Sequence, residues 1–179
     1  MNPHPCLLTD EQVSEFGVHV GGSIYHFEER ETGRKYSLFE FTVRTTQMSS
    51  AVDYLRRNGG DPSWIIFCLH NPEVISANVF DQLINLQFAK VGGVVGLEWV
   101  LLLDRNVADR KSVVEYAERH GYKLELRKLN EVQFLRVETG DLPWLGKHIL
   151  EDLYGVTPDT SLGLLLGKLT MSSDWPSHN

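Results

Sequence analysis

Two nearly uninterrupted apolar runs constrain the fold of this chain more than any other feature. They are WIIFCLH at residues 64–70 and LEWVLLL at residues 97–103. A strand with one face toward water alternates apolar and polar residues, whereas a strand covered on both faces does not. We therefore expect both runs to be buried central strands, as in the parallel sheets of α/β proteins.

Helical patterns separate these runs and end at glycine. Residues 47–58 and 107–120 have apolar residues at helical spacing, and residues 79–91 read VFDQLINLQFAKV before Gly92-Gly93. Glycine is favoured directly after a helix. Strand–helix–strand units of this kind favour right-handed crossovers and parallel neighbours.

The two ends of the chain add further elements. Residues 23–29 and 36–44 alternate with a period of two around a Thr-Gly turn, which indicates a hairpin. Residues 122–129 and 132–137 indicate a second antiparallel pair, and helices are expected from Asp141 to about 154 and again from Thr157. The predicted fold class is α/β: a mixed sheet with parallel central strands, an N-terminal β-hairpin and C-terminal helices packed on it. We expect one domain over residues 1–179, with frayed tails at 1–8 and 172–179.

Charge disfavours some partners. The formal net charge is -7, whereas binding to a phosphate backbone draws on surplus lysine and arginine. The segment 105–128 is locally basic, with seven basic residues against four acids. Arg105, Arg110 and Lys111 are therefore candidate ligands for an anion, and the segment is a candidate nucleic-acid surface. The alternative is a solvated helix flank of mixed charge.

Three features bear on the compartment and on cofactors. They are the cysteines, the spacing of the histidines and the length of the apolar stretches. Cys6 and Cys68 form no disulfide framework, and the first residues show no signal peptide. The longest apolar stretches fall short of the roughly 20 residues that span a bilayer. The seven histidines have no zinc-ligand spacing, and no nucleotide-binding loop is present. We expect a cytoplasmic protein without metal, cofactor or membrane contact.

The candidate catalytic residues follow the two apolar runs. Ligands of open α/β sheets gather at the carboxyl ends of strands. His70 ends the first run, Asp104 follows the second, and Ser76 lies shortly after His70. If the two strands are neighbours, a histidine, an acid and a serine meet at one edge, as nucleophilic catalysis requires. The alternative is that Asp104 caps the following helix.

Two segments carry more apolar residues than one helix face needs. These are residues 79–91 and the expected final helix, which contains Leu162, Leu164, Leu165, Leu166 and Leu169. A helix that is apolar around most of its circumference is covered on more than one side. Either the C-terminal helices cover the earlier one, or a partner protein or a second copy does.

The layout of residues 41–126 resembles that of STAS domains, the protein-binding modules of anti-sigma-factor antagonists. The resemblance rests on the order WIIFCLH, ISANVFDQLINLQFAKVGG, a second buried strand and a helix ending HGY. It implies partner binding that phosphorylation of Ser76 would switch. The family's Asp-Ser-x-Gly is replaced by Ile75-Ser76-Ala77-Asn78 here, which puts that switch in doubt.

The sequence thus favours a small acidic protein that acts by protein–protein binding, as a regulator or an immunity-type inhibitor. One alternative is a hydrolase or transferase with its site around His70 and Asp104. A further alternative is nucleic-acid binding through residues 105–128.

Overall fold

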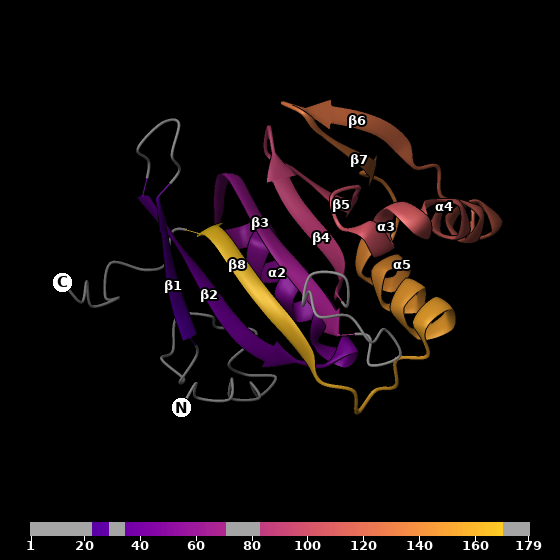
Figure 1. The fold of residues 1–179 in the computed structure, drawn as a ribbon, viewed down its shortest axis with the longest axis horizontal. Helices are drawn as coiled ribbons and strands as arrows, with labels where there is room; N and C mark the ends of the chain where they lie inside the picture. The colour runs from indigo at the N-terminus through magenta and orange to yellow at the C-terminus, as the bar shows by residue number, and fades with distance from the viewer. Residues whose placement is uncertain (1–22, 29–34, 71–82, 170–179) are drawn as a thin grey trace.

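The computed structural model describes residues 23–28, 35–70 and 83–169. Figure 1 shows a twisted sheet with helices packed beside it. The sheet has eight strands in the order β1-β2-β8-β3-β4-β5-β7-β6, and every pair of neighbours is antiparallel. The strands are β1 Ser23–Glu28, β2 Lys35–Val43, β3 Gly59–His70, β4 Leu83–Val91, β5 Val94–Val100, β6 Glu125–Leu129, β7 Val132–Val137 and β8 Leu162–Leu169.

The prediction of parallel central strands is wrong. The two apolar runs do contribute β3 and β5, but β4 lies between them and pairs antiparallel with both. The first run lacks polar alternation because both of its faces carry apolar side chains. Ile65 and Phe67 point into the core, while Trp64 and Ile66 are partly exposed on the other face.

The expected helix at residues 79–91 is also wrong over its described part. Residues 83–91 form β4, in which Ile84, Leu86 and Phe88 are buried at alternate positions. Gly92 (φ 60°) and Gly93 (φ 78°) form the two-residue turn into β5. Two consecutive left-handed residues are typical of such hairpin turns and favour glycine. The Gly-Gly pair therefore marks a hairpin and not the end of a helix.

The expected final helix is wrong as well. Residues 162–169 form β8, which lies between β2 and β3 in the sheet. Leu162 and Leu164 point into the core, and Gly163 between them would weaken a helix. The apolar excess of this segment therefore belongs to an interior strand with neighbours on both sides. The resemblance to STAS domains fails for the same reasons, since its middle helix is a strand and its sheet is not parallel.

The other expected elements are confirmed. The helices are α2 Met48–Asn58, α3 Asp104–Ala108, α4 Arg110–Arg119 and α5 Leu142–His148, which a π-helical turn, Ile149–Leu153, continues. Strands β1 and β2 pair antiparallel, as do β6 and β7 through Asn130 and Glu131. The expected tails and Ser76 lie outside the described residues.

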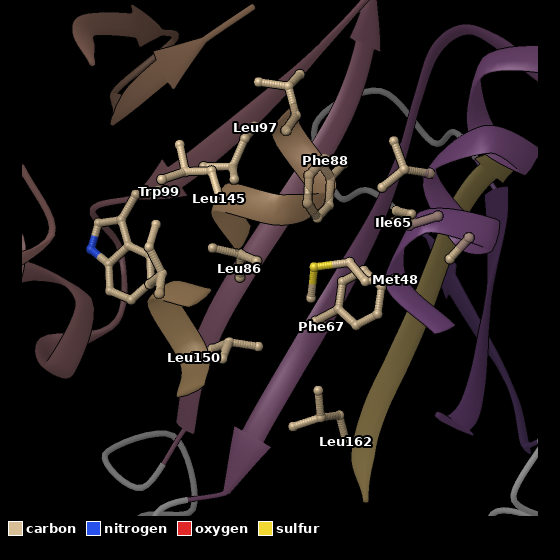
Figure 2. Close-up of a cluster of buried hydrophobic side chains, with 14 of the residues drawn as sticks. Met48, Ile65, Phe67, Leu86, Phe88, Leu97, Trp99, Leu145, Leu150 and Leu162 are labelled. Carbon is tan, nitrogen blue, oxygen red and sulfur yellow. The ribbon is translucent and has the colours of Figure 1, made fainter. Parts of the chain in front are cut away.

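The core lies between the sheet and the helices α2 and α5. Figure 2 shows Met48 of α2 and Leu145 of α5 among strand side chains such as Phe67, Phe88 and Trp99. At Gly146 an added Cβ would lie 2.8 Å from both Leu86 and Phe88. The missing side chain at Gly146 lets α5 pack closely against β4. Helices α2 and α5 thus cover one face of the sheet.

Candidate functional site

The face of the sheet that points away from the core carries a hollow. Its volume is about 570 Å³, and it is lined by residues of β3, β4, β5, β7 and β6. Alternate residues of these strands point into it, because their neighbours point into the core. The residues that line the hollow are therefore determined by which side chains of each strand point away from the core.

The floor of the hollow is a polar row that crosses four strands. Strand pairing places Gln87 of β4 opposite Glu98 of β5, Glu98 opposite Arg136 of β7, and Arg136 opposite Glu125 of β6. Arg136 and Glu98 are buried, with 2% and 5% of their surface exposed. A buried ion pair of this kind requires that each charge be satisfied by its neighbours.

Arg136 meets this requirement with its whole guanidinium group. It pairs with Glu98 through Nη1, and Nε donates to Glu138 at 2.7 Å. Its Nη2 donates to the backbone carbonyl of Val94 at 3.0 Å. The group lies flat over Gly96, where an added Cβ would be 2.6 Å from Cζ and Nε. Glycine at this position makes room for the buried cation.

Two acids, Glu98 and Glu138, accept hydrogen bonds from Arg136. Glu98 bonds Arg136 through one oxygen and accepts from Gln87 Nε2 at 2.6 Å through the other. Glu138 accepts from Arg127 at 2.8 Å and from Arg136 at 2.7 Å. The hydrogen bond from Arg127, and next the one from Arg136, lowers the pKa of Glu138 below its ordinary value. We call Glu98, Arg136, Glu138, Arg127 and Glu125 the charge ladder, since Arg127 also contacts Glu125.

Most residues in the walls of the hollow are apolar, although Ser63, Lys128 and Asn130 also line it. Trp64 of β3 and Ala89 and Val91 of β4 line one side, and Val132 and Phe134 of β7 line the other. Val91 is half exposed, at 50% of its surface. Apolar walls with a few fixed polar groups at the base are typical of binding pockets.

Beyond the hollow, Asn106 fastens the start of α3 to the sheet. Its side chain bonds both the amide and the carbonyl of Asn85, at 3.2 and 2.8 Å, and donates to Val100 at 3.0 Å. The residue is fully buried. The buried side-chain oxygen of Asn85 has no hydrogen-bond partner among the described residues.

The structure places two of the predicted catalytic residues, His70 and Asp104, at the ends of strands that are not neighbours. His70 ends β3 and Asp104 begins α3 after β5, so both follow strands that end at the same edge. Strand β4 separates those strands by about two strand spacings, roughly 10 Å. Asp104 is exposed, and its helix shows no side-chain cap. Ser76 lies outside the described residues.

The three predicted anion ligands are dispersed along α3 and α4. Arg105 pairs with Asp109 at 2.6 Å, and Asp109 also accepts from the Tyr154 hydroxyl at 2.8 Å. Lys111 pairs loosely with Glu115, at 3.6 Å, and Arg110 is exposed. Arg105 is thus part of the tie between α3 and the segment after α5.

A cluster of aromatic and imidazole rings joins α4 to α5. Trp144 stacks on His148 with ring centroids 4.1 Å apart, and His120 contacts Trp144 and Tyr116. The Tyr116 hydroxyl donates to Asp152 at 2.5 Å. Burial, and next this hydrogen bond, raises the pKa of Tyr116, so its hydroxyl stays protonated as a donor. The cluster therefore fastens two helices together.

The sequence did not predict the charge ladder or the hydrogen bonds that join Asn106 to the sheet. The signal for Glu98 was present: it is the one charged residue in an otherwise apolar run. Its partner Arg136 is 38 residues away, and sequence spacing did not connect them.

Among the described residues no helix combines the length and apolar character that a membrane crossing requires. Within the same ranges, histidine, cysteine and acidic side chains do not gather in the groups of three that could hold a metal ion. No protein-family model, curated protein or solved structure matches the chain.

Proposed function

We propose that this protein acts by binding a partner protein on the open face of its sheet, over the hollow between Trp64 and Phe134. The observation that carries the proposal is the combination of apolar walls with a charge ladder whose members satisfy one another. A floor of this kind holds a fixed shape but offers few unpaired charges for chemistry. It suits recognition better than catalysis.

The apolar walls define the chemistry of the partner. Protein interfaces place aromatic and aliphatic side chains at their centre and polar groups around the rim. Phe134 and Val132 would form such a centre, and Lys128 and Glu131 lie beside them at 3.1 Å from each other. The partner would insert one or two apolar side chains into the hollow.

A regulator or an immunity-type inhibitor that acts in the cytoplasm fits this arrangement. The excess of acids in the whole chain, at -7, favours a partner with a basic surface.

Site-specific photocrosslinking tests the proposal. A benzophenone amino acid replaces Val132 in the wall of the hollow, and in a matched protein it replaces Glu118, which is exposed on α4. In cells of the natural source, we expect one adduct of defined mass from position 132 and none from position 118. The added change Phe134→Ala should reduce the yield of that adduct.

Other outcomes contradict the proposal. Adducts from position 118 alone would place the interaction on the helical side of the molecule. Equal yields from both positions, unaffected by Phe134→Ala, would indicate unspecific collision.

A further inference from the structure

Strand β6 forms one edge of the sheet, and half of its backbone groups face away from β7. Lys128 lies opposite Gln133 in the β6–β7 hairpin. The carbonyl of Gln133 accepts from the amide of Leu101 at 2.9 Å, on the β5 side of β7. In an antiparallel pair that is not hydrogen-bonded, both residues direct their backbone groups away from each other. The amide and carbonyl of Lys128 therefore point outward, as do those of Leu126 two residues earlier.

The side chains of β6 are two exposed leucines and three charged residues, Glu125, Arg127 and Lys128. Leu126 is 50% exposed and Leu129 is 67% exposed. An edge strand that presents ladder groups and apolar side chains together is a template for another strand. Figure 1 shows β6 at the rim of the described sheet, on the side away from β1.

We propose that β6 pairs antiparallel with β6 of a second copy, with Leu126 opposite Leu126 across a two-fold axis. In this register the outward backbone groups of the two Leu126 residues bond each other, and those of Lys128 bond Leu124 of the second copy. Glu125 of each copy lies opposite Arg127 of the other, on the face that carries the hollow.

The charges of β6 favour this register over registers whose two-fold axis lies at a nearby residue. A two-fold axis at Arg127 would set two arginines opposite each other, an axis at Glu125 two glutamates, and an axis at Lys128 two lysines. Like charges directly opposite destabilise antiparallel strands, whereas opposite charges stabilise them. The axis at Leu126 gives two opposite-charge pairs and one apolar pair.

The pairing extends the charge ladder of each copy. Arg127 already contacts Glu138 at 2.8 Å and Glu125 at 3.4 Å. In the dimer it also meets Glu125 of the second copy, so the two ladders join. Because the two-fold axis is perpendicular to the sheet, both hollows open on the same side of a continuous sheet.

Disulfide trapping tests the register. Leu126→Cys is introduced in a chain that also carries Cys6→Ser and Cys68→Ala, and Leu129→Cys in the same background is the control. Opposed residues of a hydrogen-bonded pair have Cα atoms about 5.5 Å apart, within the range for a disulfide. The two Leu129 residues would be about 20 Å apart, six residue steps along the strands.

We expect mild oxidation to give a covalent dimer from Leu126→Cys and little from Leu129→Cys. Leu129 is the more exposed of the two, so random collision would favour the control. Equal trapping, or more trapping at position 129, would overturn the proposed register.

Light scattering over a wide range of concentration tests the dimer itself. The chain has a mass of 20.4 kDa, and we expect twice that mass for the natural sequence at high concentration. Leu126→Arg, which sets two positive charges opposite each other, should give a folded monomer by circular dichroism. Val132→Lys, which alters the hollow, should leave the mass unchanged, so this test is independent of the proposed function. A natural chain that stays monomeric at every concentration, or a dimer that survives Leu126→Arg, would overturn the proposal.

Discussion

Arg136 and Glu98 form a buried ion pair that requires one specific arrangement of the surrounding strands. Both charges are buried. Glu98 is held from β4 and β7, and Arg136 is held by Glu98 and Val94 of β5 and by Glu138, which follows β7. We predict that Arg136→Met lowers the free energy of unfolding by about 3–5 kcal/mol, because it leaves the carboxylate of Glu98 buried without its cation. Urea unfolding followed by circular dichroism measures this loss.

The double variant provides the control for this prediction. Adding Glu98→Met removes the stranded charge and should recover part of the loss, since apolar residues often replace a buried ion pair well. If the double variant is less stable than Arg136→Met alone, the stranded carboxylate is not the cause.

Gly96 tests the close packing beneath Arg136. We predict that Gly96→Ala costs about 1–3 kcal/mol, because its Cβ would lie 2.6 Å from the guanidinium carbon and displace the ion pair. Gly163→Ala is the matched control on the same face, where the nearest side-chain atom, Cβ of Cys68, is 3.4 Å away. Thermal unfolding of both variants should show a clear loss at position 96 and a much smaller one at position 163.

Glu138 gives the ladder a pH dependence of known sign. Its folded pKa lies below the ordinary value of 4.5, so the ionised group stabilises the fold above that pH. This contribution disappears as the pH falls through the folded pKa. We predict that Glu138→Gln is less stable than the natural chain near neutral pH, by under about 1 kcal/mol for a partly exposed pair. The difference should shrink below pH 4.5 in urea titrations, and a difference independent of pH would contradict this assignment.

At the scale of elements, two variants compare Asn106, which has a structural role, with Asp104, for which a catalytic role was expected. Asn106→Ala removes three hydrogen bonds that join α3 to β4 and β5, and we predict a loss of about 2–4 kcal/mol. Asp104→Asn alters an exposed side chain and should change the stability by less than about 0.5 kcal/mol. Equal losses in urea unfolding would show that Asp104 holds the helix as firmly as Asn106 does.

The elements that the sequence predicted correctly share a local cause. The helices at α2, α4 and α5 bury one stripe of apolar residues, and Asp141 caps α5 by accepting from the amide of Trp144 at 3.0 Å. Such signals lie within one or two turns of chain. The β6–β7 hairpin was equally local, because only two residues separate its strands.

The elements that were predicted wrongly have no local signal strong enough to distinguish the spacing of apolar residues in a helix from that in a strand. Residues 83–91 carry apolar residues on both faces of the strand, since Ala89 and Val91 line the hollow while Leu86 and Phe88 fill the core. That density resembles a buried helix as much as a strand. The same ambiguity affects β8, where Leu162 and Leu164 point into the core and Leu165, the next residue, points to the other face.

At the scale of the whole molecule, the order of the strands in the sheet could not be predicted from the sequence. Placing β8 between β2 and β3, and β4 between β3 and β5, depends on contacts between residues far apart in the chain. The charge ladder could not be predicted for the same reason, because it exists only where β5, β7 and β6 lie side by side.

The proposed dimer makes the stability of the whole molecule depend on concentration. Pairing binds the folded state and not the unfolded one, so the melting temperature should rise with protein concentration. We predict that this rise is present in the natural chain and absent in Leu126→Arg, as measured by scanning calorimetry. A rise of the same size in both would assign association to another surface.

Strand β8 also sets the order in which the chain can fold as it leaves the ribosome. Strands β2 and β3 are separated in the sheet by a segment that is synthesised about a hundred residues after them, at positions 162–169. Until that segment emerges, the β1–β2 hairpin has no edge of the main sheet to join. A chain expressed without residues 157–179 should remain incomplete, and a synthetic peptide of that sequence should complete it, as one half of a split protein completes the other.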